Sequence, residues 1–273
     1  MEEAEEEQSL VAHHVMDLQG LPEGCIANIV SLTSPRDACR LSLLSKTFMS
    51  AADSDAVWDK FLPPEKRTMS PEELGCFAAK SKKDVYLALY PVLFSEGKLS
   101  FSLDKWSGKK CYMIPARELG IVWGGTPLYW RWISHPESRF VEVAELLHVC
   151  WLEMHGKIET RLLFPLTLYK AYLVFKFTAR ASGFENLPAE VSIGLEGGET
   201  TSQTEFLHSG VIDRHRYPKV RFDGWLEIEM GEFLTEGENG VLKMHCLANG
   251  GGHWKRGLVV EGIEVRPANR QCL

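Results

Sequence analysis

Closely spaced cysteines are missing from this chain of 273 residues. Its seven cysteines are scattered and odd in number, and none belongs to a C-x-x-C pair. A disulfide framework or a zinc site needs such spacing, so the sequence predicts neither, and it predicts no metal or other cofactor. We interpret the cysteines as reduced thiols that mostly pack as small buried side chains.

Long apolar runs and an excess of positive charge are also missing. No run reaches the roughly 20 apolar residues that cross a bilayer, and the formal charge is -7. Glutamates occupy five of the first seven positions, whereas a secretory signal begins with basic residues and an apolar core. Binding to phosphate backbones needs clustered Lys and Arg. We therefore expect neither a membrane nor nucleic acid as a partner, and a cytoplasmic and/or nuclear location.

The motifs of common enzyme classes are absent as well. The sequence has no phosphate loop of the G-x-x-x-x-G-K type, no H-E-x-x-H and no G-x-S-x-G. The glycines at 250–252 are followed by neither the lysine nor the helix of a phosphate loop, and they predict a hairpin turn. Solvent-facing positions are expected for Glu227 and Glu229 on a strand and for Arg221 in a sparse basic cluster. The prediction is a protein that is not an enzyme.

Helical signals follow an acidic leader at 1–16, which is expected to be disordered. Pro22 suits the first turn of a helix with one apolar face, and Ser34 begins a capping box at the start of a second helix. Ser54 precedes a third short helix, which two prolines end. The sequence therefore predicts a domain of three helices over 17–63.

Beyond that domain the periodicity changes from helical to strand-like. Residues 64–115 carry two further capping signals, at Ser70 and Ser81, and are predicted to form a helical linker. From 116 to 267, apolar residues alternate with polar ones and glycines punctuate the pattern. The clearest alternations are at 191–195, 226–230 and 242–246. We predict a multidomain fold, α then β, whose second domain is an antiparallel, jelly-roll-like β-sandwich followed by a tail at 268–273.

An ordered set of motif residues runs from 17 to 62. It comprises Asp17-Leu18-Gln19-Gly20-Leu21-Pro22, Ser34-Pro35-Arg36-Asp37, Ser45-Lys46-Thr47-Phe48 and Asp55-Ala56-Val57-Trp58. Together they resemble an F-box, which implies that apolar side chains of three helices bind a Skp-type adaptor and, through it, a cullin. The implied adaptor contacts are Leu21, Pro22, Ile26, Ile29, Val30, Leu41, Leu44, Val57 and Trp58. The alternative is that these side chains form a small helical core, although so short a block cannot bury most of its own apolar surface.

A second set of motif residues begins at Ala116. It includes Ile121-Val122-Trp123, Pro127-Leu128-Tyr129-Trp130-Arg131-Trp132, Asp223-Gly224-Trp225-Leu226-Glu227-Ile228 and Gly262-Ile263-Glu264-Val265-Arg266-Pro267. This set resembles the phloem lectins of plants, the Nictaba-like group. The resemblance implies that Trp123 and Trp130 correspond to the tryptophans that stack on a sugar and wall its pocket; burial in the sandwich core is the alternative for each. An F-box followed by such a domain looks like the plant F-box lectins, which implies the substrate-recognition subunit of a Skp–cullin–F-box ubiquitin ligase.

Sugar binding also needs polar groups, often carboxylates, and here the chain departs from the family pattern. The acidic residues of the lectins correspond to Val241 and Ala248, neither of which offers a carboxylate. Loss of a charged hydrogen-bond acceptor costs about 1.5–3 kcal/mol. Glu238, Asn239 and Asn249 are candidate replacements.

Different kinds of target therefore remain open. The β domain either recognises a glycan, such as an N-acetylglucosamine oligomer or an N-glycan core, or reads a protein surface through its loops or an edge strand. The missing carboxylates favour the protein surface. A third reading is an intracellular lectin that acts independently of ubiquitination.

Overall fold

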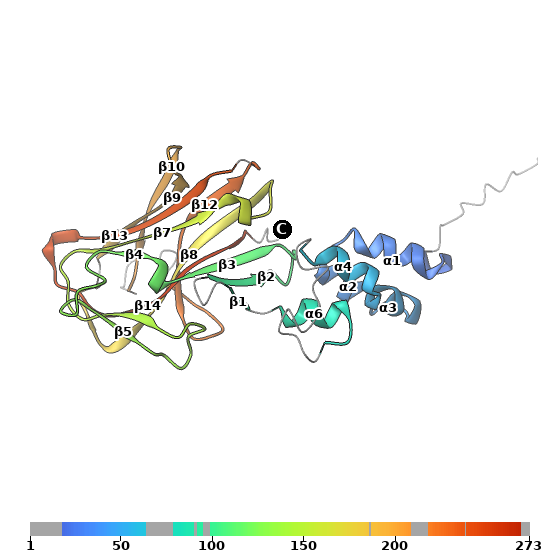
Figure 1. Ribbon diagram of the computed structural model, residues 1–273, viewed down its shortest axis with the longest axis horizontal. Helices are drawn as coiled ribbons and strands as arrows, with labels where there is room; N and C mark the ends of the chain where they lie inside the picture. Colours follow the sequence, from blue (N-terminus) through green and yellow to red (C-terminus); the bar gives the residue numbers. More distant parts are fainter. Residues whose placement is uncertain are drawn as a thin grey trace, which may run out of the picture.

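The structure is a computed structural model that describes residues 18–63, 79–89, 92–94, 99–185, 187–208, 218–237 and 239–268. Helices form one end of the molecule and two antiparallel sheets form the other (Figure 1). The predicted fold class, α and then antiparallel β, is confirmed. The acidic leader and the capping signal at Ser70 lie outside the described residues. Within the described part of the chain, no helix is long and apolar enough to span a membrane.

The helical part follows the capping signals of the sequence. Its elements are η1 (Leu18–Gly20), α1 (Glu23–Ser31), α2 (Pro35–Leu41), α3 (Lys46–Asp53), α4 (Asp55–Phe61) and α6 (Lys82–Ala88). The side-chain oxygens of Ser34, Ser54 and Ser81 accept hydrogen bonds from first-turn amides of α2, α4 and α6. The second predicted helix is divided in two, because Ser45 caps a new helix, α3, and accepts from the Phe48 amide.

A buried tryptophan holds the helices together. Trp58 of α4 is 1 % exposed, and its indole N–H donates to the Ala52 carbonyl over 2.7 Å. Ile26 and Val30 of α1 belong to the same core. The ring of Tyr86 in α6 lies 5.2 Å from the Trp58 ring, so α6 extends the helical core towards the β domain.

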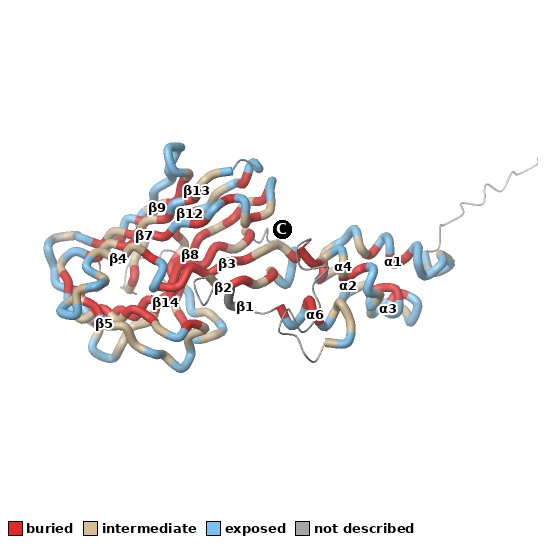
Figure 2. The backbone as a smooth tube through the Cα atoms, in the orientation of Figure 1, coloured by how far each residue is buried: buried red, intermediate tan, exposed pale blue. Residues whose placement is uncertain are grey.

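The β domain consists of two sheets. The strands are β1 (Val92–Phe94), β2 (Leu99–Leu103), β3 (Lys110–Pro115), β4 (Gly120–Ile121), β5 (Trp130–Ile133), β6 (Val143–Leu146), β7 (Leu152–Glu159), β8 (Thr167–Ser182), β9 (Pro188–Leu195), β10 (Thr200–Phe206), β11 (Lys219–Val220), β12 (Leu226–Thr235), β13 (Val241–Ala248) and β14 (Arg256–Pro267). The larger sheet has the order β1-β2-β3-β14-β8-β12-β11, with β6 also paired to β14 and β5 paired to β6. The smaller sheet has the order β10-β9-β13-β7-β4. Figure 2 shows that β8 and β14 form the buried centre of the domain.

The predicted helical linker over 64–115 is wrong in its last part. Leu99–Leu103 and Lys110–Pro115 are strands, and β3 pairs with β14 in the centre of the larger sheet. Phe101 and Leu103 are buried while Ser102 between them is partly exposed, so the alternation of a strand was present in the sequence. The capping signals before residues 99–115 favoured a helix. Pairing of β3 with the distant β14 makes this segment part of the sheet instead.

The space between the sheets is filled by the alternating apolar residues that the sequence indicated. Leu242, Met244 and Cys246 of β13 have no exposed surface. Opposite them, Gly231 of β12 approaches Ile193 so closely that a Cβ atom there would lie 2.5 Å from the Ile193 Cγ2 atom. The predicted strands at 191–195, 226–230 and 242–246 are confirmed, and their apolar sides meet in one core.

Candidate functional sites

In the described part of the chain, a stripe of apolar side chains on α1 remains exposed. Pro22 at the N-cap, Cys25 and Ile29 on the helix and Leu32 at the C-cap recur every three or four residues and therefore share one side of α1. Leu18, in η1 before the helix, is exposed as well. Ile29 is 44 % exposed and Leu32 is 88 % exposed. Leu43, Leu44 and Met49, on the turn after α2 and on α3, are also exposed. We call these eight residues the apolar helix surface.

The structure divides the candidate adaptor contacts into three groups. Pro22, Ile29 and Leu44 are exposed and belong to the apolar helix surface. Leu21 and Leu41 are partly buried against the core. Ile26, Val30, Val57 and Trp58 are at most 1 % exposed, so they support the helices from inside. The exposed residues that were missed are Leu18, Cys25, Leu32, Leu43 and Met49, although the spacing of Cys25 and Leu32 from Ile29 was a usable signal.

Trp123 lies in the loop after β4, at the end of the β domain far from the helices (Figure 1). Its side chain is 45 % exposed and packs on Tyr129 with 5.4 Å between ring centroids. Its φ of +56° is a left-handed conformation, which is strained for a bulky residue. An exposed aromatic ring on a strained backbone is typical of a binding loop.

Two other tryptophans hold that backbone in place. The Trp130 indole N–H donates to the Val122 carbonyl over 3.2 Å, and the Trp132 indole N–H donates to the Gly124 carbonyl over 3.1 Å. Trp130 is 3 % exposed. In this structure Trp130 therefore supports the loop from the buried side, whereas the Trp123 ring is partly exposed to solvent.

The two positions that correspond to the family's carboxylates lie at opposite ends of β13. Val241 begins the strand and Ala248 ends it, so about 23 Å of strand separates them. Ala248 is 1 % exposed and points into the core. Of the candidate replacements, Glu238 lies outside the described residues, Asn239 lies at the Val241 end, and Asn249 is exposed at the Ala248 end.

An acidic residue that was not considered from the sequence contacts the Trp123 loop through its backbone. The backbone carbonyl of Glu153, on β7, accepts from the Val122 N–H over 3.0 Å. The Glu153 carboxylate accepts from the Trp151 indole N–H over 2.7 Å and contacts His245 Nε2 at 3.0 Å. The hydrogen bonds from Trp151 and His245 lower the pKa of Glu153, so it is ionised at neutral pH. Only the pairing of β4 with β7 brings this acid to the loop.

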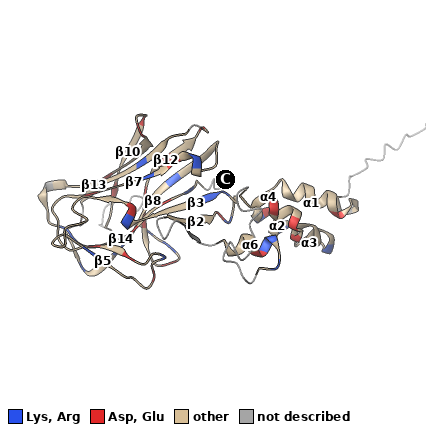
Figure 3. Cartoon of the chain, viewed as in Figure 1, with Lys and Arg blue, Asp and Glu red and all other residues tan. Residues whose placement is uncertain are grey.

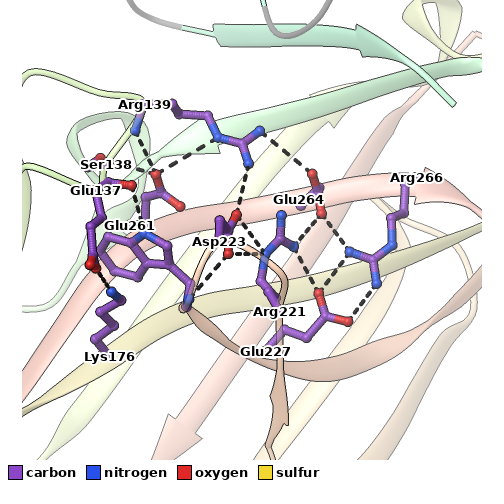
Figure 4. A network of polar contacts seen from close by, with 11 residues as sticks. Glu137, Ser138, Arg139, Lys176, Arg221, Asp223, Glu227, Glu261, Glu264 and Arg266 are labelled. Atoms are coloured by element: carbon purple, nitrogen blue, oxygen red, sulfur yellow. Dashed lines mark hydrogen bonds and ion pairs between the residues drawn. The ribbon is translucent and has the colours of Figure 1, made fainter. Parts of the chain in front are cut away.

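A second polar cluster lies on the outer side of the larger sheet (Figure 4). Arg221 contacts Glu227 at 2.8 Å and Glu264 at 2.6 Å, and Arg266 contacts the same two carboxylates at 2.6 Å each. We call these four residues the charge clamp. The solvent-facing positions expected for Arg221 and Glu227 are wrong, because both side chains are less than 10 % exposed. Glu229 is more exposed and pairs with Lys170.

The clamp joins the turn before β12 to the strands β12 and β14, which are not neighbours in sequence. Every charge in it has an opposite partner, so it is a structural device and not an empty ligand site. Elsewhere, basic and acidic residues are interspersed over both parts of the molecule (Figure 3). Among the described residues, no group of His, Cys, Asp and Glu is arranged to hold a metal ion.

Comparison with known families agrees with this architecture. Residues 18–60 match the F-box domain, and residues 109–267 match the family described as phloem protein 2. The chain belongs to the F-box proteins with a phloem protein 2 domain. Both domain families are non-catalytic, of the adaptor and lectin types. As an F-box protein with a phloem protein 2 domain, the chain is, at family level, of the ligase substrate-adaptor or lectin type.

Relatives of this F-box and phloem protein 2 family occur in Arabidopsis thaliana. The putative F-box protein PP2-B12 is 46 % identical over 256 residues, covering 92 % of this chain and 98 % of the relative. F-box protein PP2-B10 is 44 % identical over 256 residues, covering 90 % of this chain and 93 % of the relative. A β-(1,4)-mannanase structure from Podospora anserina aligns with a TM-score of 0.34 at 8 % identity, over 59 % of this chain and 28 % of that chain. So weak a likeness carries no argument about function.

Proposed function

We propose that this chain is the substrate-recognition subunit of a Skp–cullin–F-box ubiquitin ligase. The helical domain docks on a Skp-type adaptor, and the β domain holds the target near the ubiquitin-loaded enzyme, which raises the effective concentration of a target lysine. Bond-forming chemistry belongs to the partners, and the chain acts in the cytoplasm and/or the nucleus.

The observation that carries this proposal is the apolar helix surface. Leu32, Leu43 and Leu44, at the ends of α1 and α2, are 88 %, 85 % and 62 % exposed, although the helices already bury a core of their own. A group of large exposed apolar side chains of this kind is typical of a protein interface. The F-box match over 18–60 supports a Skp-type adaptor as the partner.

The docking surface is tested by replacing Ile29 and Leu44 with Asp. Ile29 is 44 % exposed and Leu44 is 62 % exposed, so Ile29→Asp/Leu44→Asp is expected to fold. It is expected to weaken adaptor binding at least a hundredfold, since two interface hot spots of about 1.5–2 kcal/mol each are lost. Titration calorimetry of the full chain with a purified Skp-type adaptor measures the affinity. Val141→Asp is the matched control, because Val141 is 82 % exposed on the β domain. Equal affinities for the two variants would refute docking through this surface.

For the target, the structure favours a glycan more than the sequence did. The Trp123 ring offers a stacking surface, and Glu153, whose backbone is hydrogen-bonded to the Trp123 loop, supplies an ionised carboxylate that the positions of Val241 and Ala248 do not. We therefore propose recognition of a glycosylated target through the Trp123 loop. Binding of sugars without any adaptor binding would instead support a lectin that acts independently of ubiquitination.

A further inference from the structure

A second aromatic surface lies at the same end of the β domain as Trp123. It borders a cleft of about 430 Å³ between the turn that follows β8 and the segment that joins β13 to β14. The lining residues are Gly183, Glu185, Leu187, Pro188, Gly250, His253 and Trp254. None of these lining residues was among the candidate sugar-binding residues of the sequence, Trp123 and Trp130.

Trp254 is the aromatic wall of the cleft. Its side chain is 52 % exposed, and His148 stacks on it with 4.3 Å between ring centroids and 23° between ring planes. A ring covered on one face and half exposed overall has its other face available to a ligand. The C–H face of a sugar ring fits such a flat, partly hydrated surface.

The position of Trp254 is fixed by the residue that follows it. Lys255 is completely buried, and its ammonium donates to the Cys150 carbonyl over 2.7 Å and to the His253 carbonyl over 2.9 Å. Val149 and Lys255 also form a backbone bridge. The segment with Trp254 is thus tied to the segment with His148, and the two stacked rings are held before any ligand arrives.

The opposite wall supplies a hydrogen-bond acceptor. The Glu185 carboxylate is exposed and accepts from the Gly183 N–H over 2.9 Å. Bonds from backbone amides, its own first, lower the pKa of Glu185, so it is ionised at neutral pH. Gly183 has a φ of +86°, and a Cβ atom there would lie 2.1 Å from the Trp254 carbonyl oxygen, so the two walls meet through a position that needs glycine.

The cleft is connected to the Trp123 loop through a short series of contacts. Trp123 packs on Tyr129, and the Tyr129 carbonyl accepts from the His148 N–H over 3.4 Å. His148 in turn stacks on Trp254. The two exposed tryptophans, Trp123 and Trp254, are therefore linked through Tyr129 and His148.

We propose that the cleft between Trp254 and Glu185 is a second saccharide-binding subsite, which makes the β domain selective for extended oligosaccharides over short ones. This inference rests on the proposed recognition of glycans through Trp123. The Trp254 ring stacks on one sugar unit and the Glu185 carboxylate accepts from its hydroxyl or amide N–H groups, while Trp123 and Glu153 bind another unit of the same chain.

The test uses the full chain and N-acetylglucosamine oligomers of two and six units, with a free N-glycan core as a second probe. On titration with the hexamer, the indole N–H resonance of Trp254, assigned as the signal missing from Trp254→Phe, is expected to shift. Trp254→Ala is expected to weaken hexamer binding about tenfold, to near the affinity of the dimer, since one aromatic stack is lost. Glu185→Gln is also expected to weaken hexamer binding. Because Glu185 is exposed, this variant should fold even if Trp254→Ala does not.

Two matched controls separate the cleft from the rest of the molecule. Trp106→Ala removes a tryptophan of similar exposure, 48 %, near the helices, and Glu190→Gln neutralises an exposed acid outside the cleft. If the hexamer binds and Trp254→Ala behaves like Trp106→Ala, the cleft is refuted while recognition through Trp123 stands. If neither oligomer nor the N-glycan core binds, both glycan proposals are overturned, and adaptor docking, measured separately, is untouched.

Discussion

At the scale of single residues, the tryptophans of the β domain have two different tasks. Trp123 presents an exposed ring on a left-handed backbone, which costs about 1–3 kcal/mol in strain. Trp130 and Trp132 offset that strain by donating hydrogen bonds to the carbonyls of the residues before and after Trp123. Replacing Trp130 or Trp132, which support the loop, should therefore change the environment of the exposed Trp123 ring.

Trp130→Phe tests this division. Phenylalanine keeps most of the packing but leaves the Val122 carbonyl without its donor, so we expect a loss of about 1–2 kcal/mol in the free energy of unfolding and a changed environment of the Trp123 indole. Urea unfolding and the Trp123 indole resonance measure the two effects. Trp225→Phe is the control, because Trp225 is also buried and loses one bond, to the Glu137 carbonyl. The proposed role fails if both variants leave the Trp123 signal unchanged.

At the scale of elements, the charge clamp joins β12, β14 and the turn before β12 in the larger sheet. Burial alone would raise the pKa of Glu264, but the guanidinium groups of Arg221 and Arg266 outweigh it and hold the pKa below its usual range. A lowered pKa in the folded state contributes stability above the unfolded value of about 4.5, and that contribution is lost as the pH falls through the folded value. The clamp should therefore make the β domain sensitive to acid.

Glu264→Gln is expected to lower the free energy of unfolding by about 3–5 kcal/mol at pH 7, because it leaves the buried Arg221 and the partly buried Arg266 short of a counter-charge. The difference from the unmodified chain should be smaller at pH 4, because below the ordinary pKa of about 4.5 the unfolded chain binds a proton at Glu264 that the folded chain does not. Chemical unfolding at the two pH values measures both effects. Glu229→Gln removes a more exposed pair with Lys170 and should cost no more than about 1 kcal/mol. An equal cost for the two variants would contradict the clamp.

At the scale of the whole molecule, the β domain and the helices meet through the turn between β2 and β3. The Arg36 guanidinium lies 3.7 Å from the centre of the Trp106 ring, and the Tyr86 hydroxyl donates to the Asp104 carbonyl over 3.4 Å. These contacts set the direction in which the loop end of the β domain points away from the helices (Figure 1). In a ligase subunit, that direction decides where a bound target is presented.

Trp106→Ala tests whether the contact fixes the arrangement. A cation–π pair at an exposed site contributes about 0.5–1 kcal/mol, so its loss should lower the population of the observed arrangement about two- to fivefold relative to opened ones. Small-angle scattering of the full chain should show a larger radius of gyration. Trp254→Ala, which removes an exposed tryptophan at the far end, should leave the scattering curve unchanged. Identical curves for Trp106→Ala and the unmodified chain would contradict a fixing role.

How far the sequence could predict the molecule depends on the range of the interaction involved. Capping at Ser34, Ser54 and Ser81 is a contact between neighbours in sequence and was predictable from local chemistry. The alternation in β13 was equally local, and its apolar side is buried as expected. The linker was wrong where β3 pairs with β14, because more than 140 residues separate the two strands.

The sequence by itself determined the order of the domains, the helix starts, the apolar sides of the strands and the membership of the F-box and phloem protein 2 families, since each is encoded in short motifs or in a period. Tertiary structure alone decided that Trp130 is buried while Trp123 is exposed, that Glu153 lies beside the loop and that Arg221 is paired inside a clamp. The physical reason is that exposure and pairing depend on which strands become neighbours. Strand pairing is a non-local choice, made by the burial of a whole sheet and not by any one segment.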